Sequence, residues 1–157
     1  RECLMKIAIG ADHGGYEMKE RMKEYITKEL GHECVDFGTC STERCDYPDY
    51  AFMVASAVSS HKCDCGIMID AVGIGSSVMA NKVPGVRAAV ANEIYSARNS
   101  KLHNGCNMLC MGSLIIGDGV AKEVIKIWLE TELSGDRNIQ RVKQICDIEA
   151  RILGCNR

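Results

Sequence analysis

Residues 65–82 constrain the fold of this 157-residue chain more than any other stretch. The apolar run at 65–69 predicts a buried strand, which leads through Asp70 and a glycine-spaced turn into the apolar spacing of a helix. A strand, a glycine turn and a helix start together place backbone N–H groups around an anion. Asp70 falls at the carboxyl end of the strand, where open α/β sheets bind ligands. We therefore expect a ligand site at this turn.

The length of the chain predicts one domain over residues 1–157, with an N-terminal extension at 1–4 and a C-terminal helix and tail at 137–157. The net charge is only −2, and Lys and Arg are scattered among Asp and Glu. This pattern argues against a nucleic-acid or membrane-surface partner. No apolar run reaches the length of a membrane span or resembles a secretory signal, so we expect a cytoplasmic protein.

The ten cysteines are expected to be reduced packing residues. A disulfide framework is typical of small, loop-rich chains, whereas this one is long and rich in helix patterns. Cys63 and Cys65 are one residue apart, and in a strand their side chains would point to opposite faces. We therefore expect no metal site there.

Strand patterns alternate with helix patterns along the whole chain, which predicts an α/β fold: a Rossmann-like, three-layer domain with a five-stranded parallel sheet. Strands are expected at 5–10, 34–37, 65–69, 86–91 and 107–111. Helices are expected at 16–30, 50–60, from 74, at 92–102, at 120–133 and from 137 towards 153, with Asp49 and Asn92 as helix caps. The last helix has an apolar face, which we expect to pack on a partner subunit.

Asp12 and His13 follow the first strand, so they should lie at the same sheet edge as Asp70. His103 and Asn104 follow a helix end and are candidates of the same kind, although a histidine there can simply favour the helix C-terminus. Arg137 and Arg141 are one helical turn apart and could hold a phosphate together, or form an ordinary solvated face.

Nucleotide cofactors are disfavoured by the glycine pattern. The pair Gly73 and Gly75 lacks the third glycine of the dinucleotide fingerprint, because Val stands at position 78. The Gly-Lys-Ser/Thr sequence of a P-loop is absent as well.

Several motifs, in order from Met5 to about Ile148, resemble ribose-5-phosphate isomerase B and the related galactose-6-phosphate isomerase subunits. They are Gly10-x-Asp12-His13-x-Gly15-Tyr16, Val35-Asp36-Phe37-Gly38-Thr39, Asp46-Tyr47-Pro48-Asp49-Tyr50-Ala51, Gly73-Ile74-Gly75, Ala80-Asn81-Lys82-Val83-x-Gly85-Val86-Arg87-Ala88-Ala89, Ser96-Ala97-Arg98 and His103-Asn104. The resemblance implies the same parallel sheet in a homodimer or a dimer of dimers, with active sites between subunits. It also implies an intramolecular oxidoreductase that interconverts an aldose and a ketose phosphate through a cis-enediolate, without a metal or cofactor.

The resemblance further implies a role for each candidate residue. His103 would open the sugar ring, and Asp12 and Asn104 would contact sugar hydroxyls. His13 would grip the phosphate, with Arg137 and Arg141 reaching in from the partner subunit. Tyr47 would line the pocket. The enediolate oxygens would be held by backbone N–H groups of the turn, which comprises Ala71, Val72, Gly73, Ile74, Gly75 and Ser76.

The chain departs from the family pattern at the turn itself. The usual catalytic Cys is Asp70, and the Thr that assists ring opening is Val72. Other members use a Glu after the second glycine, where this chain has Ser76. An Asp at position 70 resembles instead the A subunit of galactose-6-phosphate isomerase. A basic residue of the family corresponds to Leu114 here.

Three hypotheses follow from this mixture. The first is an active isomerase with Asp70 as the base that moves the carbon-bound proton. The second is an isomerase of a four- to six-carbon sugar phosphate other than ribose 5-phosphate, since Val72 makes the site drier than Thr would. The third is a catalytically weak, sugar-phosphate-binding subunit that needs a partner chain.

Overall fold

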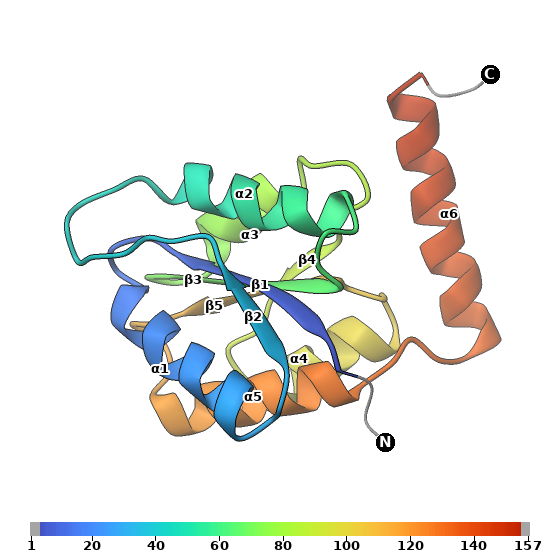
Figure 1. The fold of residues 1–157 in the computed structure, drawn as a ribbon. Coiled ribbons are helices and arrows are strands. Elements are labelled where there is room, and N and C mark those ends of the chain that lie inside the picture. The colour runs from blue at the N-terminus through green and yellow to red at the C-terminus, as the bar shows by residue number, and fades with distance from the viewer. Residues whose placement is uncertain (1–3, 155–157) are drawn as a thin grey trace.

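The computed structural model describes residues 4–154 of the chain. Residues 1–3 of the expected extension and 155–157 of the expected tail lie outside the described residues. Strands and helices alternate in the order β1 (Lys6–Ala11), α1 (Tyr16–Lys28), β2 (Glu33–Asp36), α2 (Tyr47–Ser59), β3 (Cys65–Asp70), α3 (Ile74–Ala80), β4 (Ala88–Val90), α4 (Ile94–Leu102), β5 (Met108–Gly112), α5 (Asp118–Glu130) and α6 (Asp136–Ile152) (Figure 1).

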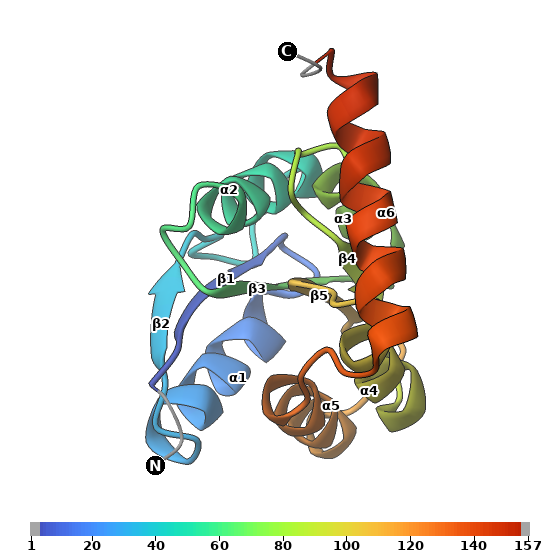
Figure 2. The same ribbon diagram turned by 90° about the vertical axis from the view of Figure 1, so that its right-hand side faces the viewer.

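The five strands form one all-parallel sheet in the order β2-β1-β3-β5-β4. Figure 2 shows the sheet nearly edge-on, with α2 and α3 covering one face and α1, α4 and α5 covering the other. Parallel strands need crossover helices on their faces, so the sheet is buried on both sides. The predicted three-layer, Rossmann-like architecture is confirmed.

The core lies in two layers, one on each face of the sheet. Every residue of β3 is buried, and the register pairs Ile67 with Ile9 of β1 and with Leu109 of β5. Trp128 of α5 is fully buried in the core layer between the sheet and the helices α1, α4 and α5. Its indole N–H donates to the Ser100 hydroxyl at 3.2 Å. Each such side chain stabilises the fold by about 1.5–3 kcal/mol, which fixes the strand ends that carry the site.

Both predicted helix caps, Asp49 and Asn92, are wrong. α2 begins at Tyr47 because Pro48 suits the first helical turn, and Asp49 lies inside that turn instead of capping it. α4 is capped by Glu93, whose carboxylate accepts from the N–H groups of Tyr95 and Ser96 at 2.6 Å each. Asn92, the expected cap, instead accepts a hydrogen bond from Gly112 N at the end of β5.

A buried lysine ties α1 to the loop beside the end of β1. The Lys19 side chain is fully buried, and its Nζ donates to both carboxylate oxygens of Asp36 at 2.8 and 2.7 Å. Asp36 Oδ1 also accepts from Gly38 N at 2.9 Å, and Gly38 O accepts from Ala11 N at 2.7 Å. Burial alone would raise the pKa of Asp36, but Lys19, Lys23 and the Gly38 N–H hold it below its ordinary value. These bonds connect Lys19 of α1, through Asp36 and Gly38, to Ala11, the residue before Asp12, and so they fix the end of β1.

The last helix, α6, lies at the edge of the sheet where the strands begin and projects beyond the body (Figure 1). Its Glu149 carboxylate accepts from Gly85 N at 3.0 Å, and Val142 is buried against the body. Its exposed apolar residues are Ile139, Ile145, Ile148 and Ile152. Among residues 4–154, no helix combines the length and apolar character that crossing a membrane requires.

Candidate active site

The carboxyl ends of β1 and β3 meet at the point where the chain changes faces of the sheet. The helix after β1 covers one face, and the helix after β3 covers the other (Figure 2). Neighbouring strands with helices on opposite faces leave a crevice at their carboxyl ends, and open α/β sheets bind ligands there. Asp12 follows β1 and Asp70 ends β3, so the expectation that they share one edge is confirmed.

Asp12 is buried, with only 7% of its surface exposed. Among the described residues, only one of its two carboxylate oxygens has a hydrogen-bond partner. Its Oδ1 accepts from Gly14 N at 2.9 Å and from Gly15 N at 3.1 Å. Burial raises the pKa of Asp12; the Gly15 and Gly14 N–H groups and His13 act against this, while the charge of Asp70 adds to it. The crevice therefore holds a carboxyl group whose environment disfavours its charged form.

Asp70 is folded into its own turn. Oδ1 accepts from the N–H groups of Val72, at 2.9 Å, and Gly73. Oδ2 accepts from Ser76 N at 3.1 Å and from the Ser76 hydroxyl. Gly73 adopts the left-handed conformation (φ 84°) that lets the turn close around the carboxylate. Three of the six N–H groups expected to hold an enediolate thus bind Asp70, while those of Ala71, Ile74 and Gly75 stay outside this set of bonds.

His13 and Tyr47 border the same crevice. His13 Nδ1 lies 3.0 Å from the carbonyl oxygen of Cys45 and 3.3 Å from its nitrogen, so the ring is oriented by the loop before α2. Its Nε2 has no hydrogen bond within residues 4–154 and can face a ligand. Tyr47 lies over Gly75: a Cβ added at Gly75 would come within 2.5 Å of the Tyr47 ring. Tyr47 thus lies against the turn, whereas His13 lies beside the loop before α2, and their contacts with a substrate stay predictions.

Two polar residues that the sequence analysis did not assign to the site lock the crevice together. The Ser113 hydroxyl donates to Gly14 O at 2.7 Å, and the Ser113 N–H donates to Asp70 O at 2.8 Å. Asn92 Oδ1 accepts from Gly112 N at 2.8 Å, and its Nδ2 donates to Val72 O at 3.4 Å. Their place directly after β4 and β5 is the signal that could have found them.

Four predicted site residues do not join this cluster within one chain, namely His103, Asn104, Arg137 and Arg141. α4 runs antiparallel to β4, so its C-terminal end, capped by His103, lies at the opposite edge of the sheet. Arg87, which precedes β4, donates to Gly105 O at 3.0 and 2.8 Å and so marks that edge. Arg137 and Arg141 are exposed in the first turns of α6, at the same edge. His103 and Asp70 therefore lie at opposite edges of the sheet within one chain.

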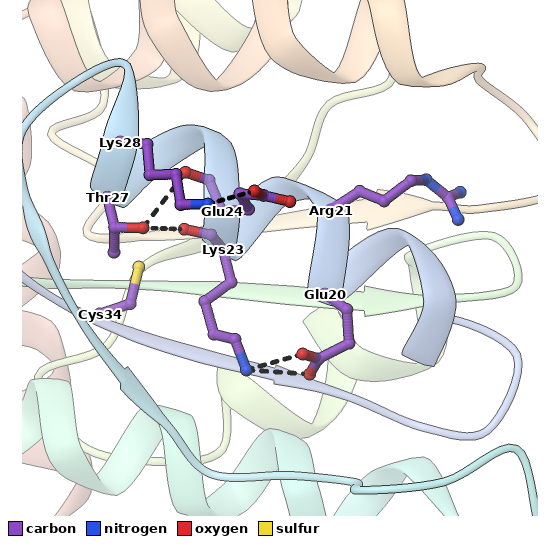
Figure 3. Close-up of a pocket in the computed structure, with 7 residues that line it drawn as sticks. All are labelled: Glu20, Arg21, Lys23, Glu24, Thr27, Lys28 and Cys34. Atoms are coloured by element: carbon purple, nitrogen blue, oxygen red, sulfur yellow. Dashed lines mark hydrogen bonds and ion pairs between the residues drawn. The ribbon is translucent and has the colours of Figure 1, made fainter.

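A pocket away from this edge runs along α1 beside β2, and each charged side chain that lines it has an ion-pair partner (Figure 3). Lys23 pairs with Glu20 and Asp36, Lys28 pairs with Glu24, and Arg21 pairs with Asp118. Burial raises the pKa of the Cys34 thiol to about 12, so it is a poor nucleophile. No group of three or more metal-ligating side chains occurs in the described part of the chain. The β1–β3 crevice is the candidate active site.

A model of the Ribose/Galactose Isomerase family matches residues 7–145. The chain belongs to this family. It is 44% identical over 148 residues to ribose-5-phosphate isomerase B of Escherichia coli, which covers 94% of this chain and 99% of that protein. A solved structure of Clostridium thermocellum ribose-5-phosphate isomerase B superposes with a TM-score of 0.91, at 45% identity, over 94% of this chain and 99% of that one.

Family membership makes the chain an isomerase enzyme. D-erythrulose-4-phosphate isomerase of Pectobacterium atrosepticum is 34% identical over 143 residues, which cover 90% of this chain and 93% of that protein. The family therefore includes relatives named for sugar phosphates of different lengths. What this member accepts depends on the residues of its own crevice.

Proposed function

We propose that this sugar-phosphate isomerase interconverts an aldose phosphate and a ketose phosphate through a cis-enediolate. Ribose 5-phosphate and ribulose 5-phosphate are the first candidates, and related four- to six-carbon sugar phosphates are the others. The observation that carries the proposal is that Asp12 and Asp70 lie at the same ends of the neighbouring strands β1 and β3, close enough for their charges to interact, with His13 beside them. Carbon-to-carbon proton transfer needs a base of this kind, held away from bulk water.

We assign Asp70 as the base that moves the proton between the two carbons. Its oxygens accept four hydrogen bonds, so one of these must open before Asp70 can take a proton. The Ser76 hydroxyl can leave by rotating about its side-chain bond, whereas the three backbone N–H groups are fixed by the turn. The N–H groups of Ala71, Ile74 and Gly75 remain for the enediolate oxygens.

The rest of the site would come from a second copy of the chain. Four groups with expected roles lie at the opposite edge of the sheet from Asp70 in their own subunit. They are His103 for ring opening, Asn104 for hydroxyl contact, and Arg137 and Arg141 for phosphate binding. A homodimer, or a dimer of dimers, would bring this edge of one copy to the β1–β3 crevice of the other. The exposed isoleucines of α6 support such an association.

The substrate is constrained by Val72, which is 38% exposed at the turn. A threonine there could offer a hydroxyl to the sugar, and valine cannot, so polar substrate groups near it would lose a partner. Sugar phosphates with fewer hydroxyl groups near position 72 are therefore the candidates to compare with ribose 5-phosphate.

A second candidate function is a binding subunit with little activity of its own. It is favoured by one observation, namely that all four hydrogen-bond positions of the Asp70 carboxylate are filled from within its own turn. Such a subunit would bind sugar phosphate through His13 and the arginines, and would need another chain to supply the base.

A substrate panel followed by proton NMR in deuterated buffer separates these functions. We expect the purified chain alone to convert at least one four- to six-carbon aldose phosphate and to exchange the transferred carbon-bound proton with solvent. Sedimentation of the same sample should give a dimer or tetramer. Binding of every sugar phosphate without turnover would support the binding subunit, and a monomer with turnover would contradict the two-copy site.

A further inference from the structure

Asp12 presents the free carboxylate oxygen of the crevice. Its Oδ1 is held by the Gly14 and Gly15 N–H groups, whereas no described residue donates to Oδ2. Among residues 4–154, no buried side-chain oxygen lacks a partner, so Oδ2 is within reach of solvent even though the residue is only 7% exposed. The same loop lies against the turn that follows β3, since a Cβ at Gly14 would lie 3.8 Å from Ala71 N.

The two carboxyl groups are thus set up for different tasks. Asp70 meets only donors, three of which are backbone N–H groups that cannot accept a proton. Asp12 has one oxygen fixed and one open. Paired carboxyl groups in unlike environments are a common arrangement for an acid and a base that work on one substrate.

Aldose–ketose isomerisation requires two proton movements. One proton moves between the two carbons, and a second moves from the hydroxyl oxygen of one carbon to the carbonyl oxygen of the other. The second movement needs a group that can both give and take a proton between adjacent oxygens. Nothing in the roles assigned so far provides it.

We propose that Asp12 is a further catalytic residue, which carries the proton between the two sugar oxygens through its open Oδ2. This inference rests on the proposed function. As Asp70 takes the proton from C2 of the aldose, the Asp12 carboxylic acid gives its proton to O1. The Asp12 carboxylate then takes the proton from O2 as the ketone forms, and Asp70 returns its proton to C1, so that both groups end as they began.

The surroundings of Asp12 suit this role. The titratable groups that face it are Asp70 and His13, and the N–H groups of Gly14 and Gly15 complete its shell. Burial and the charge of Asp70 raise the pKa of Asp12 despite the lowering effect of the other three groups. A carboxyl group whose pKa is raised stays protonated to higher pH than an exposed aspartate, and so it can donate to a carbonyl oxygen over a wider range of pH.

The test is Asp12→Asn, measured in deuterated buffer with the substrate that the wild-type chain converts. Asparagine keeps an oxygen for the Gly14 and Gly15 N–H groups, so the loop is retained. We expect kcat to fall by about 10²–10³-fold with KM changed by less than about threefold. The enediolate still forms in this variant, but its onward conversion to ketose is slowed. Exchange of the carbon-bound proton of the recovered aldose with solvent should therefore fall less than isomerisation does. We expect the ratio of the exchange rate to the isomerisation rate to rise by about tenfold.

Glu17→Gln is the matched control, because Glu17 is an exposed acid in the first turn of α1, close to Asp12 in sequence. It should leave both rates unchanged. Equal loss of exchange and isomerisation in Asp12→Asn, or no loss at all, would overturn the role of Asp12 while the wild-type turnover upheld the proposed function. Absence of turnover in the wild-type chain would instead overturn both.

Discussion

Asp70→Asn should abolish isomerisation while leaving the binding of sugar phosphate measurable. Asparagine has nearly the shape of aspartate, but its amide cannot take up a proton from carbon, so kcat should fall by about 10³-fold or more. The phosphate contacts assigned to His13, Arg137 and Arg141 do not pass through position 70, so affinity should change little. Calorimetric titration with ribose 5-phosphate and NMR turnover on the same sample separate the two quantities.

The same variant carries a cost in stability that must be measured beside its activity. The asparagine oxygen can still accept from Val72 N and Gly73 N, but its NH₂ group then faces Ser76 N, which is also a donor. Two opposed donors in a buried turn cost about 1–3 kcal/mol. Thermal unfolding shows whether the turn survives, and Glu43→Gln, in the exposed loop before α2, is the control. A folded Asp70→Asn variant with full activity would reject Asp70 as the base.

Gly15→Ala should be the most damaging small substitution in the fold. A Cβ at Gly15 would lie 1.9 Å from the carbonyl oxygen of Ile69, a backbone atom in the middle of the sheet that cannot move aside. Overpacking against backbone at such a distance should cost about 4 kcal/mol or more. A domain of this size has about 5–15 kcal/mol in total, so the variant should unfold at much lower denaturant concentration or fail to accumulate in soluble form.

Gly14→Ala is the matched control for this prediction. At Gly14, the nearest atom to an added Cβ is Asp12 Oδ1 at 3.4 Å, an ordinary contact, and the glycine is exposed. We expect its free energy of unfolding to stay within about 1 kcal/mol of the wild-type value. Equal denaturation midpoints for Gly15→Ala and the wild-type chain would show that α1 does not approach β3 as described.

The alternation of apolar strands and helices was enough to predict the architecture, because a parallel sheet covered by crossover helices is one of the few folds that bury the apolar residues of such a pattern. The same logic placed Asp12 and Asp70 at one edge. It could not place His103, since position past a helix end does not reveal that α4 returns the chain to the opposite edge. Only the direction of the helix against its strand decides this.

The hydrogen bonds within the turn could not be predicted from the sequence pattern, for a different reason. Asp70 was expected to stand beside N–H groups that hold a ligand, but a carboxylate of this length can close an Asx-type turn on itself and take those donors first. Likewise, Asn92 suited a helix cap by composition, but Gly112 N, 20 residues away in sequence, is its partner. Contacts between distant strand ends are set by the assembled sheet and not by local propensity.

The proposed active site is shared between two copies of the chain, and mixing two inactive variants tests this sharing most directly. In one variant Asp70→Asn removes the base, and in the other His103→Ala removes the ring-opening group. When the two are dissociated and reassembled together, each mixed dimer should contain one intact site. Random pairing then predicts recovery of about a quarter of wild-type activity per chain. Mixed dimers that remain as inactive as their parents would contradict a site formed between two copies.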